Sequence, residues 1–156
     1  MKLSENFTLK EMTKSITAKR KGIENTPDEQ QIENLTELCE KVLQPLRDMM
    51  GPITISSGFR SPYLNAAIGG SATSQHCAIK GAAADIDICT GECDDKNAEV
   101  FHNIKDNFVF DQLIWEFGSE DCPDWVHISY NYGKNRKQIL KAVKRNGKTK
   151  YLNYED

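Results

Sequence analysis

The sequence predicts an α+β fold, a small antiparallel sheet flanked by helices. One long stretch, 27–50, has apolar residues at helical spacing. Four short segments, 53–58, 82–88, 111–117 and 125–130, have the composition and length of β-strands, and an Asn-Gly pair near the C-terminus is typical of a β-hairpin turn. Helices mixed with hairpin-linked strands in 156 residues favour one α+β domain spanning 1–156.

The N-terminal half is expected to be mainly helical. Thr8 and Glu11 form a capping-box pattern for a short first helix, and residues 17–27 are expected to be an exposed loop. The 27–50 helix is predicted to begin with a Thr26 cap and Glu29 as its capping-box partner, and Pro45 is expected to bend it. Its apolar stripe is predicted to pack in the core: Ile32, Leu35, Leu38, Cys39, Val42, Leu43, Leu46 and Met49.

The remaining elements follow from caps, alternation and turns. Ser61 followed by proline starts a short helix over 61–69, and a polar loop leads from it to the 82–88 strand. Asp94 is predicted to cap a helix that reaches about residue 108. After the 111–117 and 125–130 strands, Asn146 and Gly147 favour a hairpin over a helix.

Composition excludes several classes of protein. The net charge is −3 and charges of both signs are mixed along the chain, which argues against a broad nucleic-acid-binding surface. No run of eighteen apolar residues indicates a membrane span, and the N-terminus has no apolar stretch typical of a signal peptide. We therefore expect synthesis in the cytoplasm, no membrane partner, and a monomer. The five cysteines are expected to be thiols, and Cys89 and Cys93 are expected to lie in a loop.

Two histidines and an aspartate are the candidate metal ligands. His76 lies in the polar loop, Asp85 projects from the strand that follows, and His127 shares a strand face with Trp125 and Ser129. Two imidazoles and a carboxylate suit a catalytic zinc with one open position. On spacing alone a structural role is the favoured explanation of these residues, because any chain with three histidines offers several such sets.

Three segments carry a resemblance to a known family. SGFRSPYLN, SQH with KGAAADI, and WVHISY are similar to the motifs of the zinc D-Ala-D-Ala carboxypeptidases, a group that includes vancomycin-resistance dipeptidases, phage endolysin peptidases and the hedgehog domain. The resemblance covers about residues 3–145. It implies that His76, Asp85 and His127 bind Zn²⁺, that Asp124 is the general base, and that Arg60 binds substrate or stabilises the oxyanion.

One departure from the family pattern concerns the loop before the strand. The family's loop histidine and aspartate are seven residues apart, whereas His76 and Asp85 are nine apart. Alignment on KGAAAD keeps Asp85 as the ligand and places the extra residues in the loop, where insertions are tolerated. Asp87 is the alternative ligand.

Two further polar residues are predicted to contact the substrate. Gln75 precedes His76, and Glu116 lies on the same strand face as Ile114. Their alternatives are a solvated loop residue and an exposed strand residue, and Asp124 could instead cap a turn after Pro123.

The resemblance implies a peptidoglycan peptidase that cleaves a peptide bond of the stem peptide or cross-bridge. As a carboxypeptidase or endopeptidase without a signal peptide, it would suit a phage or prophage endolysin released to the wall through a separate pore. The alternative is a non-catalytic binding or phage structural module on the same scaffold.

Overall fold

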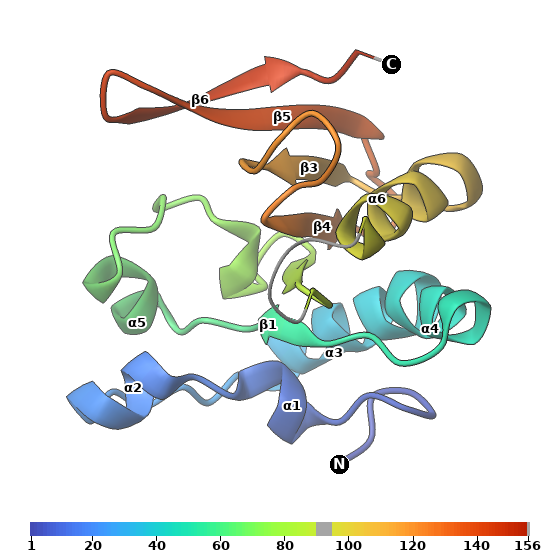
Figure 1. Cartoon of the computed structure of the whole chain (residues 1–156). Coiled ribbons are helices and arrows are strands. Elements are labelled where there is room, and N and C mark those ends of the chain that lie inside the picture. The colour runs from blue at the N-terminus through green and yellow to red at the C-terminus, as the bar shows by residue number, and fades with distance from the viewer. Residues whose placement is uncertain (90–94, 156) are drawn as a thin grey trace.

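The structure, a computed structural model, describes residues 1–89 and 95–155, and in it helices flank one six-stranded sheet (Figure 1). The helices are α1 (Leu9–Thr13), α2 (Ile16–Lys21), α3 (Glu29–Leu38), α4 (Gln44–Met50), α5 (Pro62–Ala67) and α6 (Lys96–Asn107). A π-helical segment, Cys39–Leu43, joins α3 to α4, and Gln75–Cys77 form a single 3₁₀ turn. The strands are β1 (Ile55–Ser57), β2 (Ala82–Ile86), β3 (Gln112–Glu116), β4 (Trp125–Tyr130), β5 (Gln138–Arg145) and β6 (Lys148–Asn153).

The strand order is β1-β2-β4-β3-β5-β6, and every neighbouring pair is antiparallel except β3 with β5. This mostly antiparallel sheet with flanking helices confirms the predicted α+β class. The predicted C-terminal hairpin is present as β5–β6. Its turn residues Asn146 and Gly147 have φ angles of 53° and 73°, the left-handed values that an Asn-Gly hairpin turn requires.

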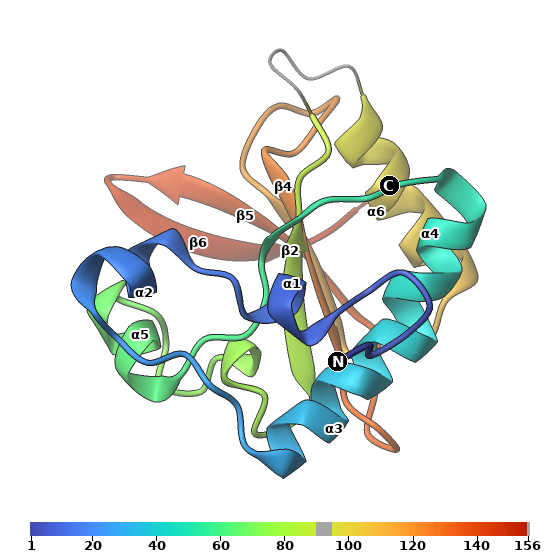
Figure 2. The same ribbon diagram turned by 90° about the horizontal axis from the view of Figure 1, so that it is seen from below.

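The two faces of the sheet have different partners. Helices α3, α4 and α6 lie on one side of the sheet, and α2 and α5 lie on the other (Figure 2). Val126 and Ile128 are fully buried in the core, on the side of α3, α4 and α6. Alternation along β4 turns His127 to the opposite face, as predicted. A smaller apolar cluster of Ile114, Leu140 and Ala142 is packed on that second face.

The long helix packs its apolar side into the core but begins later than predicted. Asp28, not Thr26, is the N-cap, and its partner in the capping box is Gln31 rather than Glu29. The apolar stripe is buried as expected from Leu35 to Leu46, but Ile32 is only partly buried. The prediction that Met49 packs in the core was wrong, because Met49 lies in the last turn of α4 and is 52% exposed. The expected irregularity near Pro45 occurs as the π-helical segment just before it, where the missing proline N–H removes a helical hydrogen bond.

Other local predictions need correction or fall outside the described residues. The segment 17–27, expected to be a loop, contains most of α2, because Ser15 caps its first turn and Gly22 ends it with φ 65°. The Asp94 cap and Cys93 lie outside the described residues, and α6 follows Asp95. Cys39 and Cys77 are buried free thiols, but Cys122 is disulfide-bonded, so the expectation of thiols throughout was wrong.

None of the helices in the described ranges has both the length and the apolar character needed to span a membrane.

Candidate metal centre

The sheet and one loop bring His76, Asp85 and His127 together. Asp85 on β2 and His127 on β4 are cross-strand partners, so their side chains lie side by side on the same face. The 3₁₀ turn supplies His76. Asp85 Oδ1 lies 3.3 Å from His76 Nε2 and 3.1 Å from His127 Nδ1. One ligand atom from each residue lies within 4.8 Å of the others, so sequence reasoning identified a set that does converge in space.

The orientation of His76 leaves one ring nitrogen for a ligand. Its Nδ1 lies 2.8 Å from the carbonyl oxygen of Gly58. Because a carbonyl only accepts, Nδ1 carries the proton, and Nε2 of the neutral ring is a lone-pair donor facing Asp85. A neutral Nε2 and a carboxylate oxygen repel each other at 3.3 Å. The pair is therefore stable only with a proton on Nε2 or a cation between the two atoms.

These separations fit one tetrahedral ion. Ligand atoms bound about 2.0–2.1 Å from a tetrahedral zinc lie roughly 3.3–3.4 Å apart. Asp85 Oδ1 lies 3.3 and 3.1 Å from the two histidine nitrogens, close to that value, and all three ligand atoms lie within 4.8 Å of one another. Two nitrogens and one oxygen leave the fourth position for water or substrate, so the three side chains fit a catalytic zinc.

The electrostatics of Asp85 also suit a cation site. Burial by itself would raise the pKa of this carboxyl. In the metal-free site with a proton on His76 Nε2, the positive charge of His76 and hydrogen bonds from both histidines outweigh burial and hold the pKa of Asp85 well below its ordinary value. Asp85 is therefore a carboxylate at neutral pH.

The nine-residue spacing is accommodated by bonds from helix α3 to the loop. Gln31 Nε2 donates to the carbonyl of Cys77 at 3.0 Å, and Asn34 Nδ2 donates to that of Ala78 at 2.8 Å. Ala78 itself has a left-handed φ of 56°. The longer loop is thus held against the helix while His76 still reaches Asp85.

The alternative ligand, Asp87, is engaged elsewhere. Its Oδ1 accepts hydrogen bonds from Asn97 Nδ2 at 3.0 Å and from the Cys89 amide at 3.2 Å. Asp85 is the carboxylate that meets both histidines.

Arg60 lies between the histidine loop and a cavity. Its backbone amide donates to the His76 carbonyl at 2.9 Å, and its Nη2 donates to Ser74 Oγ at 3.3 Å. Burial lowers the pKa of the guanidinium, and the negative charge of Asp85 partly offsets that effect. Its Nε is buried and has no hydrogen-bond partner in the described part of the chain.

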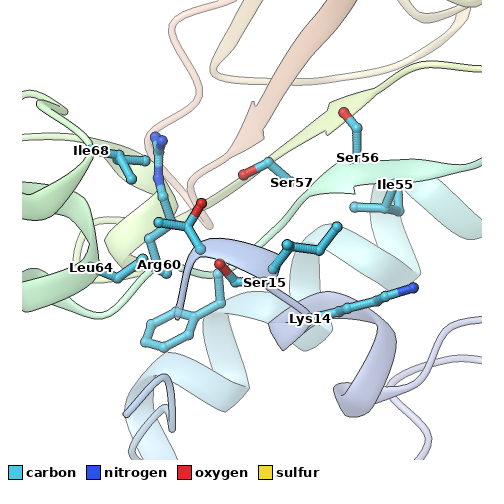
Figure 3. A pocket seen from close by; sticks show the side chains of 11 residues that line it. Lys14, Ser15, Ile55, Ser56, Ser57, Arg60, Leu64 and Ile68 are labelled. Atoms are coloured by element: carbon cyan, nitrogen blue, oxygen red, sulfur yellow. The ribbon is translucent and has the colours of Figure 1, made fainter. Parts of the chain in front are cut away.

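The cavity beside Arg60 has a volume of about 340 Å³. Ser57, Phe59, Leu64 and Ile68 line it together with the first turn of α2 (Figure 3). Ser57 is the cross-strand neighbour of Asp85. The cavity therefore adjoins the metal centre on the β1 side.

Glu116 lies on the β3 side of the triad, the three candidate ligands His76, Asp85 and His127. It is 7% exposed and shares the sheet face of Ile114, the cross-strand partner of His127. Burial raises the pKa of its carboxyl to about 7; the charge of His127 lowers the pKa and that of Asp85 raises it. A carboxyl with such a pKa can exchange protons near neutral pH.

Asp124 is exposed and immediately precedes β4. Its amide donates to the Glu116 carbonyl at 2.9 Å, and its own carbonyl accepts from Asn97 Nδ2 at 3.0 Å. These bonds fix the backbone and leave the carboxylate at the solvent-facing end of the β3–β4 pair.

Gln75 is brought to a second polar cluster. Its Nε2 donates to Asp111 Oδ2 at 2.7 Å and to the Lys80 carbonyl at 2.9 Å. Asp111 is 2% exposed and also accepts three bonds from Arg136. Both donor positions of the Gln75 amide thus stabilise the loop that carries His76.

Sequence reasoning missed the groups that support the ligands. Gly58, Gln31 and Asn34 hold the histidine loop through single hydrogen bonds. Gly58 falls in the SGFRS motif, which was the available signal. Nothing in the local sequence around Gln31 and Asn34 indicates contacts more than forty residues away along the chain.

Comparison with known proteins agrees with this geometry. A family model described as Peptidase M15 matches residues 5–129 and so includes all three candidate ligands, Arg60 and Asp124. A search of curated proteins found no match. Because the family model covers most of the chain, this protein belongs to the Peptidase M15 family, the metallopeptidases that include the zinc D-Ala-D-Ala carboxypeptidases.

Proposed function

We propose that this protein is a zinc-dependent peptidase of the bacterial cell wall, which hydrolyses a peptide bond in the stem peptide or cross-bridge of peptidoglycan. The observation that carries the proposal is the convergence of His76 Nε2, Asp85 Oδ1 and His127 Nδ1 at separations suited to one ion. Membership of a zinc peptidase family supports the same reaction type.

His76, Asp85 and His127 would hold the zinc, which supplies a Lewis acid that lowers the pKa of water and polarises a carbonyl. Asp124 accepts the proton of the attacking water and delivers it to the leaving amine. Its position three residues before His127 and next to Glu116 supports this role. Arg60 stabilises the developing oxyanion or a substrate carboxylate through its planar guanidinium.

The cavity beside Arg60 is the proposed site for one end of the peptide. A guanidinium next to an apolar and hydroxyl-lined space suits a short side chain followed by a carboxylate or carbonyl. Stem peptides of peptidoglycan, with alanine residues and a free carboxylate, have that chemistry. Action on the wall after phage-mediated release belongs to the same proposal.

The test pairs zinc content with hydrolysis of purified peptidoglycan, in the wild type and in two variants. His127→Ala removes a proposed ligand, and His102→Ala removes an exposed histidine of α6. We expect about one zinc per chain in the wild type and in His102→Ala, and loss of both zinc and peptide release in His127→Ala.

Other results would redirect or overturn the proposal. Zinc binding without hydrolysis of any wall type favours a non-catalytic binding module. Wild-type protein that binds no zinc would contradict the metal centre itself, and His76, Asp85 and His127 would then be structural residues.

A further inference from the structure

The sheet face that carries the metal centre continues onto the C-terminal hairpin. Ile114 on β3 pairs with His127 on one side and Leu140 on the other, and Glu116 pairs with Ala142. Ala142 in turn pairs with Tyr151 on β6. Because cross-strand partners point to the same face, Tyr151 lies on the face of Glu116 and His127, at the far edge of the sheet.

The sheet face between Tyr151 and the metal centre is apolar and largely buried. Ile114, Leu140 and Ala142 are at most 8% exposed and form one cluster, which Phe117 extends. Tyr151 is 56% exposed, so its side chain is accessible above this surface. An accessible phenol at the edge of the sheet face that carries the metal centre suits contact with a peptide that extends from that centre.

The carboxyl groups of the site affect the pKa of the Tyr151 phenol. Burial raises the pKa of Tyr151, and the negative charges of Glu116 and Asp85 raise it further. Tyr151 is therefore a protonated donor at neutral pH. The Tyr151 hydroxyl is thus a hydrogen-bond donor on this face from which a substrate carbonyl can accept.

We propose that Tyr151 binds the peptide substrate on the β6 side of the metal centre, its hydroxyl donating a hydrogen bond to a substrate carbonyl and its ring lying along the chain. This inference rests on the proposed peptidase function. The β5–β6 hairpin lies beyond residue 129, where the family match ends. Tyr151 thus adds a contact from a part of this chain that the family model does not cover.

The sheet geometry indicates which substrate residue is contacted. Three strand spacings of about 4.8 Å separate β4 from β6, roughly 14 Å. A strand side chain stands roughly perpendicular to its sheet, so it does not shorten this lateral distance, and an extended peptide advances about 3.3 Å per residue. Tyr151 therefore meets the substrate about four residues from the cleaved bond, which makes it a specificity residue on the side opposite to Arg60.

The experiment compares Tyr151→Phe with wild type on two substrates, the dipeptide D-Ala-D-Ala and a cross-linked muropeptide dimer. The dipeptide is too short to reach Tyr151, whereas the dimer extends on both sides of its cross-bridge. We expect kcat/KM for the dimer to fall roughly 3- to 10-fold, mainly through KM, with hydrolysis of the dipeptide and zinc content unchanged. Tyr132→Phe is the matched control, since Tyr132 is 72% exposed and lies outside the hairpin.

Binding of the dimer, measured by calorimetry, separates this inference from the proposed function. Wild type that binds the dimer without cleaving it overturns the peptidase function, and weaker binding by Tyr151→Phe in that protein still supports the contact. Equal losses on both substrates, or no loss on either, overturn the assignment of Tyr151. Failure of wild type to bind or cleave the dimer overturns both proposals.

Discussion

The backbone amide of Asp124 donates a hydrogen bond to the carbonyl oxygen of Glu116 across 2.9 Å. This bond extends the β3–β4 ladder by one step beyond the pair Glu116 and Trp125. Two carboxyl groups with different surroundings are thereby held at one end of the ladder. Asp124 is exposed, whereas Glu116 is buried on the face of His127 and has a pKa raised to about 7.

Amide substitutions separate the roles of these two carboxyl groups. We expect Asp124→Asn to lower kcat roughly 100-fold or more, because general acid–base catalysis typically contributes 10²–10⁴-fold. Glu116→Gln should lower activity less and mainly raise KM, as expected for a substrate contact. Steady-state kinetics on a soluble muropeptide, with zinc content measured for each variant, checks this. A larger loss of kcat in Glu116→Gln than in Asp124→Asn would reverse the two assignments.

The raised pKa of Glu116 predicts that the free energy of unfolding of the metal-free protein falls as the pH rises. The ordinary carboxyl value is 4.5 and the folded value is about 7. Between these values the folded state binds more protons, so rising pH favours unfolding, and the penalty persists above pH 7. Glu116→Gln removes the cost of ionising this buried carboxyl. Its free energy of unfolding should exceed that of wild type at pH 8 by on the order of 2 kcal/mol, with little difference at pH 4.5.

Urea unfolding of both proteins in excess chelator at the two pH values measures this difference. Asp124→Asn is the control, because its carboxylate is exposed. An equal stability difference between Glu116→Gln and wild type at both pH values would contradict the burial of an ionisable carboxyl at this position.

Strand alternation was sufficient to predict much of the site. The pattern WVHISY turns His127 away from Val126 and Ile128, and the structure has this arrangement. The same rule placed Glu116 beside Ile114. The roles of His76 and Arg60 were predicted from the motif resemblance, because residues in a loop show no periodic pattern from which their direction can be predicted.

Competing local signals explain the errors. Thr26 with Glu29 and Asp28 with Gln31 are both plausible capping boxes two residues apart. The second prevails, and Gln31 also bonds to the Cys77 carbonyl, a tertiary contact that local sequence does not contain. Likewise the parallel pairing of β3 with β5, which places Tyr151 on the site face, joins segments with no common sequence signal.

The buried carboxylate of Asp111, away from the metal centre, is predicted to stabilise the fold. It accepts bonds from Gln75 Nε2 and from three donors of Arg136. Asp111→Asn weakens these charge-assisted bonds and should destabilise the protein by about 1–3 kcal/mol. Urea unfolding checks this against Glu120→Gln, which removes a surface ion pair with Lys141 and should change stability little. Equal losses of stability in the two variants would show that the bonds of Asp111 contribute no more than an exposed ion pair.

Gly58→Ala tests how backbone packing supports the metal ligand. A Cβ at Gly58 would lie 2.3 Å from the carbonyl oxygen of Met12, so the two backbone segments must separate. That movement displaces the Gly58 carbonyl, which holds Nδ1 of His76 at 2.8 Å. Loss of such an outer hydrogen bond typically weakens metal binding roughly 10- to 100-fold, and we expect that loss here.

A core variant separates weaker zinc binding from general destabilisation. Leu35→Ala removes a fully buried side chain of α3 and should cost about 2–5 kcal/mol. Because Leu35 makes no bond to the histidine loop that the structure shows among its described residues, zinc affinity in folded protein should stay near the wild-type value. Chelator competition at a temperature where both variants are folded measures this. Wild-type affinity in Gly58→Ala would mean that His76 keeps its orientation without the Gly58 carbonyl.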